Sequence, residues 1–172
     1  MQGTITQHVQ SNPSSLAQKA VLVPLKAIGD RASSQLINSG GLRIKGGRAS
    51  AIVQAHTALL ASAQGKLVTK AADTDMAALV GTIVTTAFNV YVFYIDVAGN
   101  LTTAMGIAGS TLANVVFPPT PEGKAMIGFV IINPTGAGSF VGGTTVLDDA
   151  GVVPNAVFAN TTSGLDPTII IS

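Results

Sequence analysis

The stretch Asn89-Val90-Tyr91-Val92-Phe93-Tyr94-Ile95-Asp96 is the clearest β-strand in this chain of 172 residues. It consists mainly of β-branched and aromatic residues, which are enriched in strands. Its apolar residues occupy successive positions, so we expect both faces of the strand to be buried. Ala98-Gly99-Asn100 then forms a turn into a partner strand over residues 101–105. The stretch therefore predicts a central strand of an antiparallel sheet.

Short strands separated by turn residues extend outward from this stretch in both directions. Residues 126–132 are also apolar on both faces, which indicates a second central strand. Gln64-Gly65 is typical of a tight turn between strands. The other predicted strands are residues 42–45, 50–60, 66–69, 79–86, 111–117, 124–133, 144–147, 156–161 and 168–171. Strands at intervals of about ten residues predict an all-β fold, with an antiparallel sandwich or barrel-like body over residues 42–172.

Residues 1–41 carry helix and loop signals instead, and we interpret them as an extended N-terminal arm with short helical pieces. Pro13 precedes a predicted helix over residues 16–22, which Pro24 ends. Asp30 precedes a second predicted helix over residues 31–38, ended by two glycines. Helices this short are marginal in water by themselves. We therefore expect the apolar residues of the arm to dock on another surface.

Charged residues make up only 10 % of the chain, against about 25 % in ordinary soluble domains. Nine Lys and Arg with eight Asp and Glu are too few to cover the roughly 7,800 Å² that a monomer of this mass exposes. A contiguous apolar exterior is not tolerated free in solution. We therefore expect part of the surface to be buried against other chains, which makes this chain the subunit of an assembly.

The charges are also segregated along the chain. Residues 1–72 hold eight cations against Asp30, and residues 73–172 hold seven acids against Lys124. Halves of opposite sign suit head-to-tail contact between copies or docking on a charged partner.

Composition excludes several classes of protein. An apolar content of 47 % with a net charge of +1 excludes intrinsic disorder, and the absence of Cys excludes a disulfide scaffold, a thiolate metal site and a Cys nucleophile. Residues 1–5 have neither a basic nor an apolar region, so we expect no secretory signal.

Residues 76–95 are uncharged over the length of a membrane helix. Their Thr, Gly and β-branched residues favour two strands instead, and we expect no membrane contact.

Few residues of the chain suit catalysis. His8 and His56 lie in different segments without metal-ligand spacing. Glu122 is the only Glu and lies in a sequence typical of a β-turn. Asp148-Asp149 is the only adjacent carboxylate pair, and neighbours in a strand point to opposite faces, so a turn fits better than a shared acid-base site. The glycine-rich residues 136–143 lack the pattern of nucleotide-binding loops and are interpreted as a flexible hairpin tip. We expect no catalytic residue, no metal and no cofactor.

The basic residues of the first half are the candidate partner-binding residues. The densest cluster is Arg43, Lys45 and Arg48. All eight Phe and Tyr lie at or beyond Phe88, so no aromatic platform for nucleic-acid bases accompanies the cations. We therefore expect these cations to face an acidic protein surface rather than nucleic acid. The full candidate set is Lys19, Lys26, Arg31, Arg43, Lys45 and Arg48.

Three stretches carry a resemblance: Pro121-Glu122-Gly123-Lys124-Ala125-Met126-Ile127-Gly128-Phe129-Val130-Ile131-Ile132-Asn133-Pro134-Thr135-Gly136, Phe140-Val141-Gly142-Gly143-Thr144-Thr145-Val146-Leu147-Asp148-Asp149 and Val153-Pro154-Asn155-Ala156-Val157. These stretches lie within residues 66–170, and this part of the chain resembles a family of tailed-bacteriophage virion proteins. The members of that family are small, β-rich and described as structural, decoration or head-associated proteins. The resemblance implies no catalytic residue. It implies a place on the capsid exterior of the virion, self-association as a homotrimer, and a major capsid protein as partner.

We therefore expect a non-enzymatic virion protein that decorates or cements a phage capsid by binding across neighbouring capsid subunits. In this interpretation the arm reaches across subunit boundaries, and its affinity comes from buried area and multivalency. The alternative within the virion is a head fibre or tail spike component that adheres to the host surface. A hypothesis from another class is a small hydrolase with Asp148 or Asp149 as catalytic acid.

Overall fold

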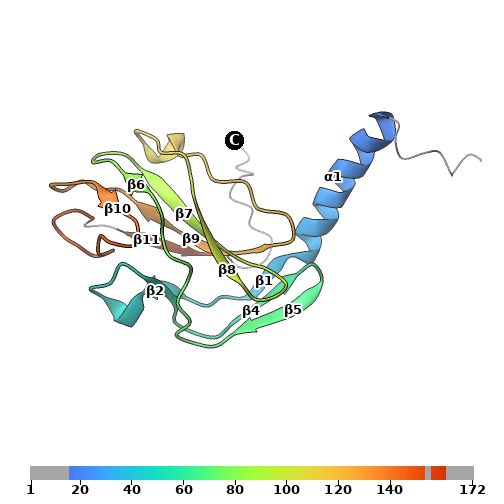
Figure 1. The fold of residues 1–172 in the computed structure, drawn as a ribbon, viewed down its shortest axis with the longest axis horizontal. Helices are drawn as coiled ribbons and strands as arrows, with labels where there is room; N and C mark the ends of the chain where they lie inside the picture. The colour runs from blue at the N-terminus through green and yellow to red at the C-terminus, as the bar shows by residue number, and fades with distance from the viewer. Residues whose placement is uncertain (1–15, 154–155, 162–172) are drawn as a thin grey trace, which may run out of the picture.

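The computed structural model of the chain describes residues 16–153 and 156–161, without the side chains of residues 16–21, 27 and 31. These residues form α1 (Leu16–Ser33) followed by antiparallel strands, which confirms the predicted all-β body (Figure 1). The strands are β1 (Gln35–Asn38), β2 (Leu42–Ile44), β3 (Val53–Ala55), β4 (Leu59–Ala63), β5 (Lys66–Lys70), β6 (Thr82–Ile83), β7 (Asn89–Ile95), β8 (Leu101–Met105), β9 (Ala125–Ile132), β10 (Phe140–Val141) and β11 (Val157–Asn160).

The largest sheet has four strands in the order β11-β9-β7-β8. β7 lies between β9 and β8, and all seven of its residues are buried. β9 is likewise central, between β7 and β11. Both runs that are apolar on two faces thus form central strands, as the sequence predicts, because only a strand covered on both faces can bury successive apolar residues.

The second sheet has three strands in the order β1-β4-β5, and β2 with β3 forms a separate ribbon. The main core lies between these strands and the four-stranded sheet. Leu36 and Leu59 pack from the three-stranded sheet, and Tyr91, Phe93 and Ile127 from the four-stranded one. The turn at Gln64-Gly65, with both residues at positive φ, joins β4 to β5 as predicted.

The opposite face of β7 is covered by the segment that follows β8. Val90, Val92 and Tyr94 form a second cluster with Phe117 and Phe129 packed against it. The two Phe rings meet edge to face, with their centroids 5.0 Å apart. This cover explains why β7 has no exposed face.

Two predicted strands are shorter in the structure. Residues 50–60 divide into β3 and the start of β4, because the chain turns at His56 and Thr57, whose N–H groups donate to backbone carbonyls of Gly41 and Gly40. Of residues 79–86, only Thr82 and Ile83 form a strand, which pairs with β10.

Two other predicted strands are wrong because local hydrogen bonds close turns there. Residues 111–117 contain a 3-10 turn at Leu112–Asn114. In residues 144–147, the N–H groups of Thr144 and Thr145 donate to the carbonyl of Val141, which makes a turn. The strand predicted at residues 168–171 lies outside the described residues.

The helical part of the arm also differs from the prediction. α1 continues through Pro24 to Ser33, so the predicted end at Pro24 is wrong. Pro24 removes one backbone donor, but the helix continues and its C-terminal end is fixed on the body, as described below. The second predicted helix, residues 31–38, contains the end of α1 and then β1.

The boundary between arm and body therefore needs correction. β1 pairs with β4, and Leu36 is a buried core residue. Residues 35–41 belong to the body rather than to an arm over residues 1–41. Burial of Leu36 on the sheet favours the strand, since fully burying a Leu side chain contributes about 1.5–3 kcal/mol.

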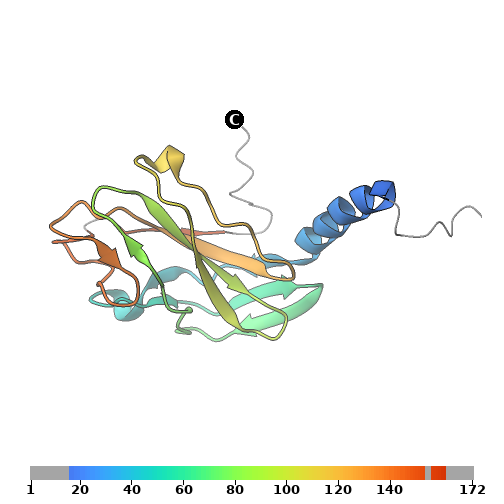
Figure 2. The same cartoon turned by 45° about the horizontal axis from the view of Figure 1, so that its top comes forward.

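Figures 1 and 2 show how the elements lie along the long axis of the molecule. α1 leaves the body at one end, and β6 and β10 lie at the other. Residues 76–95 form β6, β7 and loops, and no helix in the described part of the chain combines the length and apolarity needed to cross a membrane.

Candidate functional site

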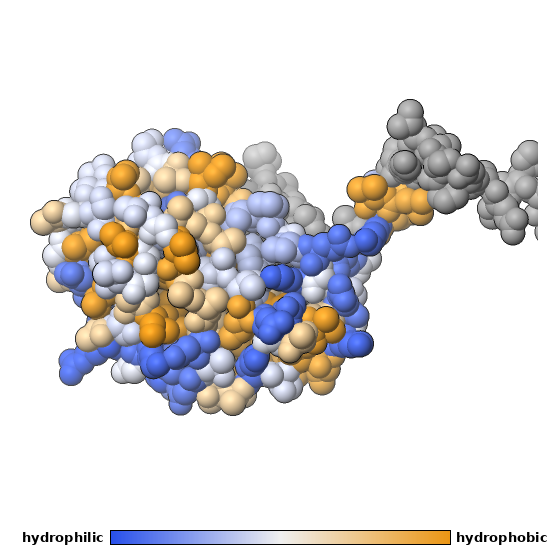
Figure 3. Space-filling view, viewed as in Figure 1, coloured by the Kyte–Doolittle hydropathy of each residue, from blue (hydrophilic) through white to orange (hydrophobic). Residues whose placement is uncertain are grey.

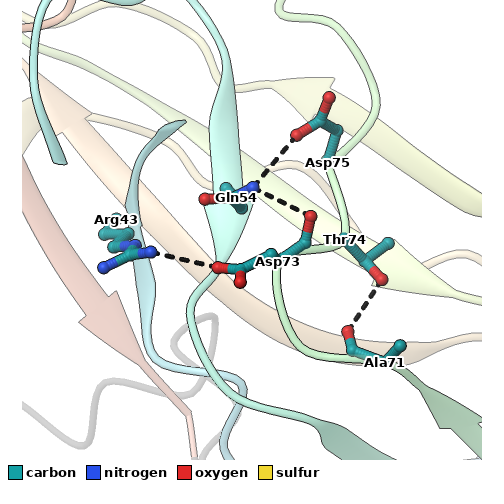
Figure 4. Close-up of polar contacts among 6 residues, drawn as sticks. All are labelled: Arg43, Gln54, Ala71, Asp73, Thr74 and Asp75. Carbon is teal, nitrogen blue, oxygen red and sulfur yellow. Dashed lines mark hydrogen bonds and ion pairs between the residues drawn. The ribbon is translucent and has the colours of Figure 1, made fainter. Parts of the chain in front are cut away.

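Two cations of the predicted basic cluster are paired with acids of the same chain. The Arg43 guanidinium lies 3.0 Å from an Asp73 carboxylate oxygen, and the Lys45 ammonium lies 2.5 Å from Asp75 (Figure 4 shows the first pair). The backbone brings these cations and acids together because residues 73–76 run beside β3, on the edge that β2 does not occupy. The N–H of Asp73 donates to the Ala55 carbonyl over 2.8 Å.

Gln54 connects the two acids from the centre of this ribbon. Its side chain is buried, and its amide nitrogen donates to the backbone carbonyl of Asp73 over 2.8 Å and to the Asp75 carboxylate over 3.5 Å (Figure 4). The acidic surface that these cations face is thus supplied by their own chain. Arg48 is exposed and has no ion-pair partner within the described residues.

Lys26 has a partner within the chain as well. Its ammonium forms an ion pair with Glu122, whose hydrogen bond and negative charge raise the pKa of Lys26. One helical turn later, the Asp30 carboxylate accepts a hydrogen bond of 2.8 Å from the N–H of Gly123. Lys26 and Asp30 together hold the turn that precedes β9.

The end of α1 is also held by the hairpin between β4 and β5. The carbonyl of Ser33 accepts hydrogen bonds from the N–H of Gly65 over 2.9 Å and from the Ser62 hydroxyl over 2.8 Å. The direction in which α1 leaves the body is therefore set by two separate turns. Of the remaining predicted partner-binding residues, Lys19 and Arg31 lie in α1, but their side chains are outside the described part.

α1 exposes large apolar side chains that sequence reasoning did not single out. Leu22, Val23, Leu25 and Ile28 are between 52 and 68 % exposed. We call Leu22, Leu25 and Ile28 the α1 apolar face. The helical repeat places Leu25 and Ile28 roughly 150° around the helix from Lys26 and Asp30, which contact the body. The spacing is visible in the sequence, but an expected break at Pro24 conceals it.

A second group of exposed apolar side chains lies in the other half of the molecule, around β6 and β10. Val80 is 75 % exposed. Val84 directly follows β6, and Val141 lies in β10, which pairs with β6. The group, which we call the distal patch, comprises Val80, Val84, Met105, Ile107, Leu112, Val116 and Val141. Figure 3 shows apolar residues there among small and weakly polar ones, while strongly hydrophilic residues gather nearer α1 and along the lower side.

The carboxylates considered for catalysis hold backbone groups in turns. Both oxygens of Asp148 accept from the N–H of Ala49 at 3.0 Å, and Asp149 accepts from the N–H of Gly151 at 2.8 Å. Asp96 accepts from the Asn100 side chain and from backbone N–H groups of the same turn, and these hydrogen bonds lower its pKa. Each acid therefore has a structural role.

The glycine-rich residues 136–143 are docked on the body rather than forming a flexible tip. The N–H of Ala137 donates to the Gly151 carbonyl over 2.7 Å, and a Cβ added at Gly136 would overlap that carbonyl. A Cβ added at Gly142 would likewise lie only 2.8 Å from the backbone carbonyl carbon of Leu79. Glycine is required at these two positions because backbone approaches backbone.

Tyr91 is a buried titratable group in the main core. Burial raises its pKa to about 12, so the phenol stays neutral at ordinary pH. Its hydroxyl has no hydrogen-bond partner among the described residues, and its ring lies edge to face with Phe140 at a centroid distance of 6.1 Å. Nothing within reach of this hydroxyl makes it a catalytic acid or base.

Within residues 16–153 and 156–161, no group of three or more His, Asp or Glu lies close enough to hold a metal ion. His56 is exposed in the turn after β3, and His8 lies outside the described residues. No protein-family model, no curated protein and no solved structure matches this chain.

Proposed function

We propose that this chain is a non-enzymatic virion structural protein that decorates or cements a phage capsid, on the capsid exterior, by binding across neighbouring capsid subunits as a homo-oligomer. Residues 66–170 resemble a family of phage virion proteins that are described as structural, decoration or head-associated proteins. The geometry supports a subunit that works by association.

One observation carries the proposal: many of the exposed large apolar side chains lie on α1 or in the opposite half of the molecule, around β6, β10 and the segment after β8. α1 lies at one end of the molecule, and β6 and β10, which carry or flank Val80, Val84 and Val141, lie at the other (Figures 1 and 2). Each exposed Val, Leu or Ile that becomes fully buried contributes up to about 1.5–3 kcal/mol. Two such surfaces suit a subunit that contacts both its own copies and a second protein.

The use of the acids supports a non-enzymatic role. Asp148 accepts a hydrogen bond from the N–H of Ala49, and Asp149 accepts one from the N–H of Gly151. Asp73 and Asp75 form ion pairs with cations of the same chain. An acid-base mechanism needs a paired group with a free proton position. These carboxylates are instead occupied in maintaining the fold.

The test is to add the purified chain to phage particles assembled without it and to image them by cryo-electron microscopy. We expect added density at regular sites over the capsid subunits. The double substitution of Val84→Asp and Val141→Asp should reduce occupancy at least tenfold, because burying two carboxylates against the capsid is costly. The matched control is Leu67→Asp on β5, where Leu67 is 65 % exposed but outside the distal patch.

The outcomes separate the hypotheses. Density over the capsid lattice that is lost only in the Val84 and Val141 variant supports decoration. A projecting stalk would support the fibre or spike alternative, and a chain that never joins the particle would refute a virion role.

A further inference from the structure

We propose that the α1 apolar face is covered by the α1 helices of other copies of this chain, in a parallel bundle of at least three. The inference deepens the proposed function by naming the contact through which the homo-oligomer forms. It rests on the helix rather than on the distal patch, so the two can be tested separately.

The spacing of the exposed apolar residues on α1 is that of a helix bundle. Leu25, Ile28 and Ala32 follow one another at intervals of three and four residues and are all exposed. In the sequence, the same spacing reaches back to Val21. This is the repeat of the two seam positions, a and d, that face partner helices in coiled coils. Leu22 widens the stripe beside the seam, as in bundles of more than two helices.

The body leaves the seam free. Lys26 and Asp30, which hold Glu122 and Gly123 of the body, occupy the b and f positions of the same repeat. These positions lie on the outer side of a coiled coil. Several helices can therefore meet along their seams while each body stays outside the bundle.

The residue types on the seam favour more than two helices. With Ile28 at d, Leu25 takes position a, and Leu at a with Ile at d shifts coiled coils from dimers to trimers and tetramers. A closed ring of three copies requires the helices to run parallel.

The apolar character of the seam positions Leu25, Ile28 and Ala32 favours a second apolar seam, that of another copy, as the occupant. Lys26 is neutralised by Glu122 on the outer side, so copies do not bring this charge to the seam. The fifteen residues that precede α1 contain no Asp, Glu, Lys or Arg. In a parallel bundle these segments begin at the same end of every helix, and they add no charge repulsion between copies.

The first experiment measures the mass of the full chain in solution by analytical ultracentrifugation. We expect the unmodified chain at three or more times its mass of 17.3 kDa. Leu25→Asp and Ile28→Asp should each give monomers, because they place a charge in the seam. Val23→Asp is the matched control, since Val23 is 68 % exposed on the same helix but lies off the seam. Circular dichroism should show the same strand content in all variants.

A second experiment tests the parallel arrangement. Because the chain contains no Cys, Leu25→Cys introduces a single thiol per copy. Equivalent a positions of parallel helices lie within reach of a disulfide, which needs Cα atoms about 4.4–6.8 Å apart. Mild oxidation should cross-link Leu25→Cys into covalent dimers and leave Val23→Cys uncross-linked.

A monomeric unmodified chain would overturn the inference, and so would equal behaviour of the Leu25 and Val23 variants. Oligomers that survive Leu25→Asp would place self-association elsewhere on the body. A monomer that still decorates capsids would refute the bundle and the homo-oligomer but not the decoration of capsids. A bundle-forming chain that never joins particles would refute the proposed function alone.

Discussion

A single hydroxyl group in the core gives the sharpest prediction at the scale of residues. The hydroxyl of Tyr91 is buried without a hydrogen-bond partner, and leaving such a group unsatisfied costs about 1–3 kcal/mol. Tyr91→Phe should therefore raise the free energy of unfolding by about 1 kcal/mol. Urea denaturation followed by circular dichroism at equal protein concentration measures this change.

The neighbouring Tyr94 provides the control for that prediction. Its ring is buried on the other face of β7, and its hydroxyl donates to the carbonyl of Pro118 over 3.5 Å. Tyr94→Phe should leave the stability unchanged or lower it. If Tyr91→Phe lowers stability as well, the hydroxyl of Tyr91 has a partner that contributes to the fold.

At the scale of elements, β1 determines where the independently folding body begins. The main core contains Leu36, but none of the α1 residues whose side chains the structure describes. A chain that starts at Ser34 keeps the pairing of β1 with β4 and should fold. A chain that starts at Leu42 loses β1 and Leu36, and removal of a buried Leu side chain alone costs about 2–5 kcal/mol.

The measurement is the urea midpoint of the two shortened chains, followed by circular dichroism. We expect a cooperative transition for the chain that starts at Ser34 and a much lower midpoint, or no transition, for the chain that starts at Leu42. Equal midpoints would mean that β1 is an accessory strand and that residues 1–41 act as one arm.

At the scale of the whole molecule, folding brings the basic and acidic halves of the chain together. The ion pairs of Lys26 with Glu122, Arg43 with Asp73 and Lys45 with Asp75 each join a cation of the first half to an acid of the second. Part of the charge separation that suits head-to-tail contact is therefore cancelled within each copy. The surfaces left for association are mainly apolar.

This arrangement predicts that self-association depends weakly on salt. At about 1 M salt the screening length falls to roughly 3 Å, which suppresses contacts between exposed charges but not apolar burial. The sedimenting mass of the full chain should therefore be the same at low salt and in 1 M sodium chloride. Dissociation at high salt would show that charges hold the copies together.

Residue types along the chain were enough to predict the two central strands, the tight turn at Gln64-Gly65 and the all-β class. Residues 89–95 and 126–132 are apolar at successive positions, and only a strand covered on both faces satisfies that pattern. The amino-acid composition also indicated a shortage of charged residues and therefore an exterior with apolar regions. These features depend on local residue type, which is why they could be read without coordinates.

The course of α1 through Pro24, the assignment of residues 35–38 to β1, and the partners of Lys26, Arg43 and Lys45 became apparent from the folded chain alone. Each depends on residues far away in the chain: Leu36 is buried in a core built mainly from later strands, and Glu122 lies 96 positions after Lys26. Local preference for helix or strand is weak compared with such contacts. The α1 apolar face follows from the same contacts, because they fix which side of the helix the body covers.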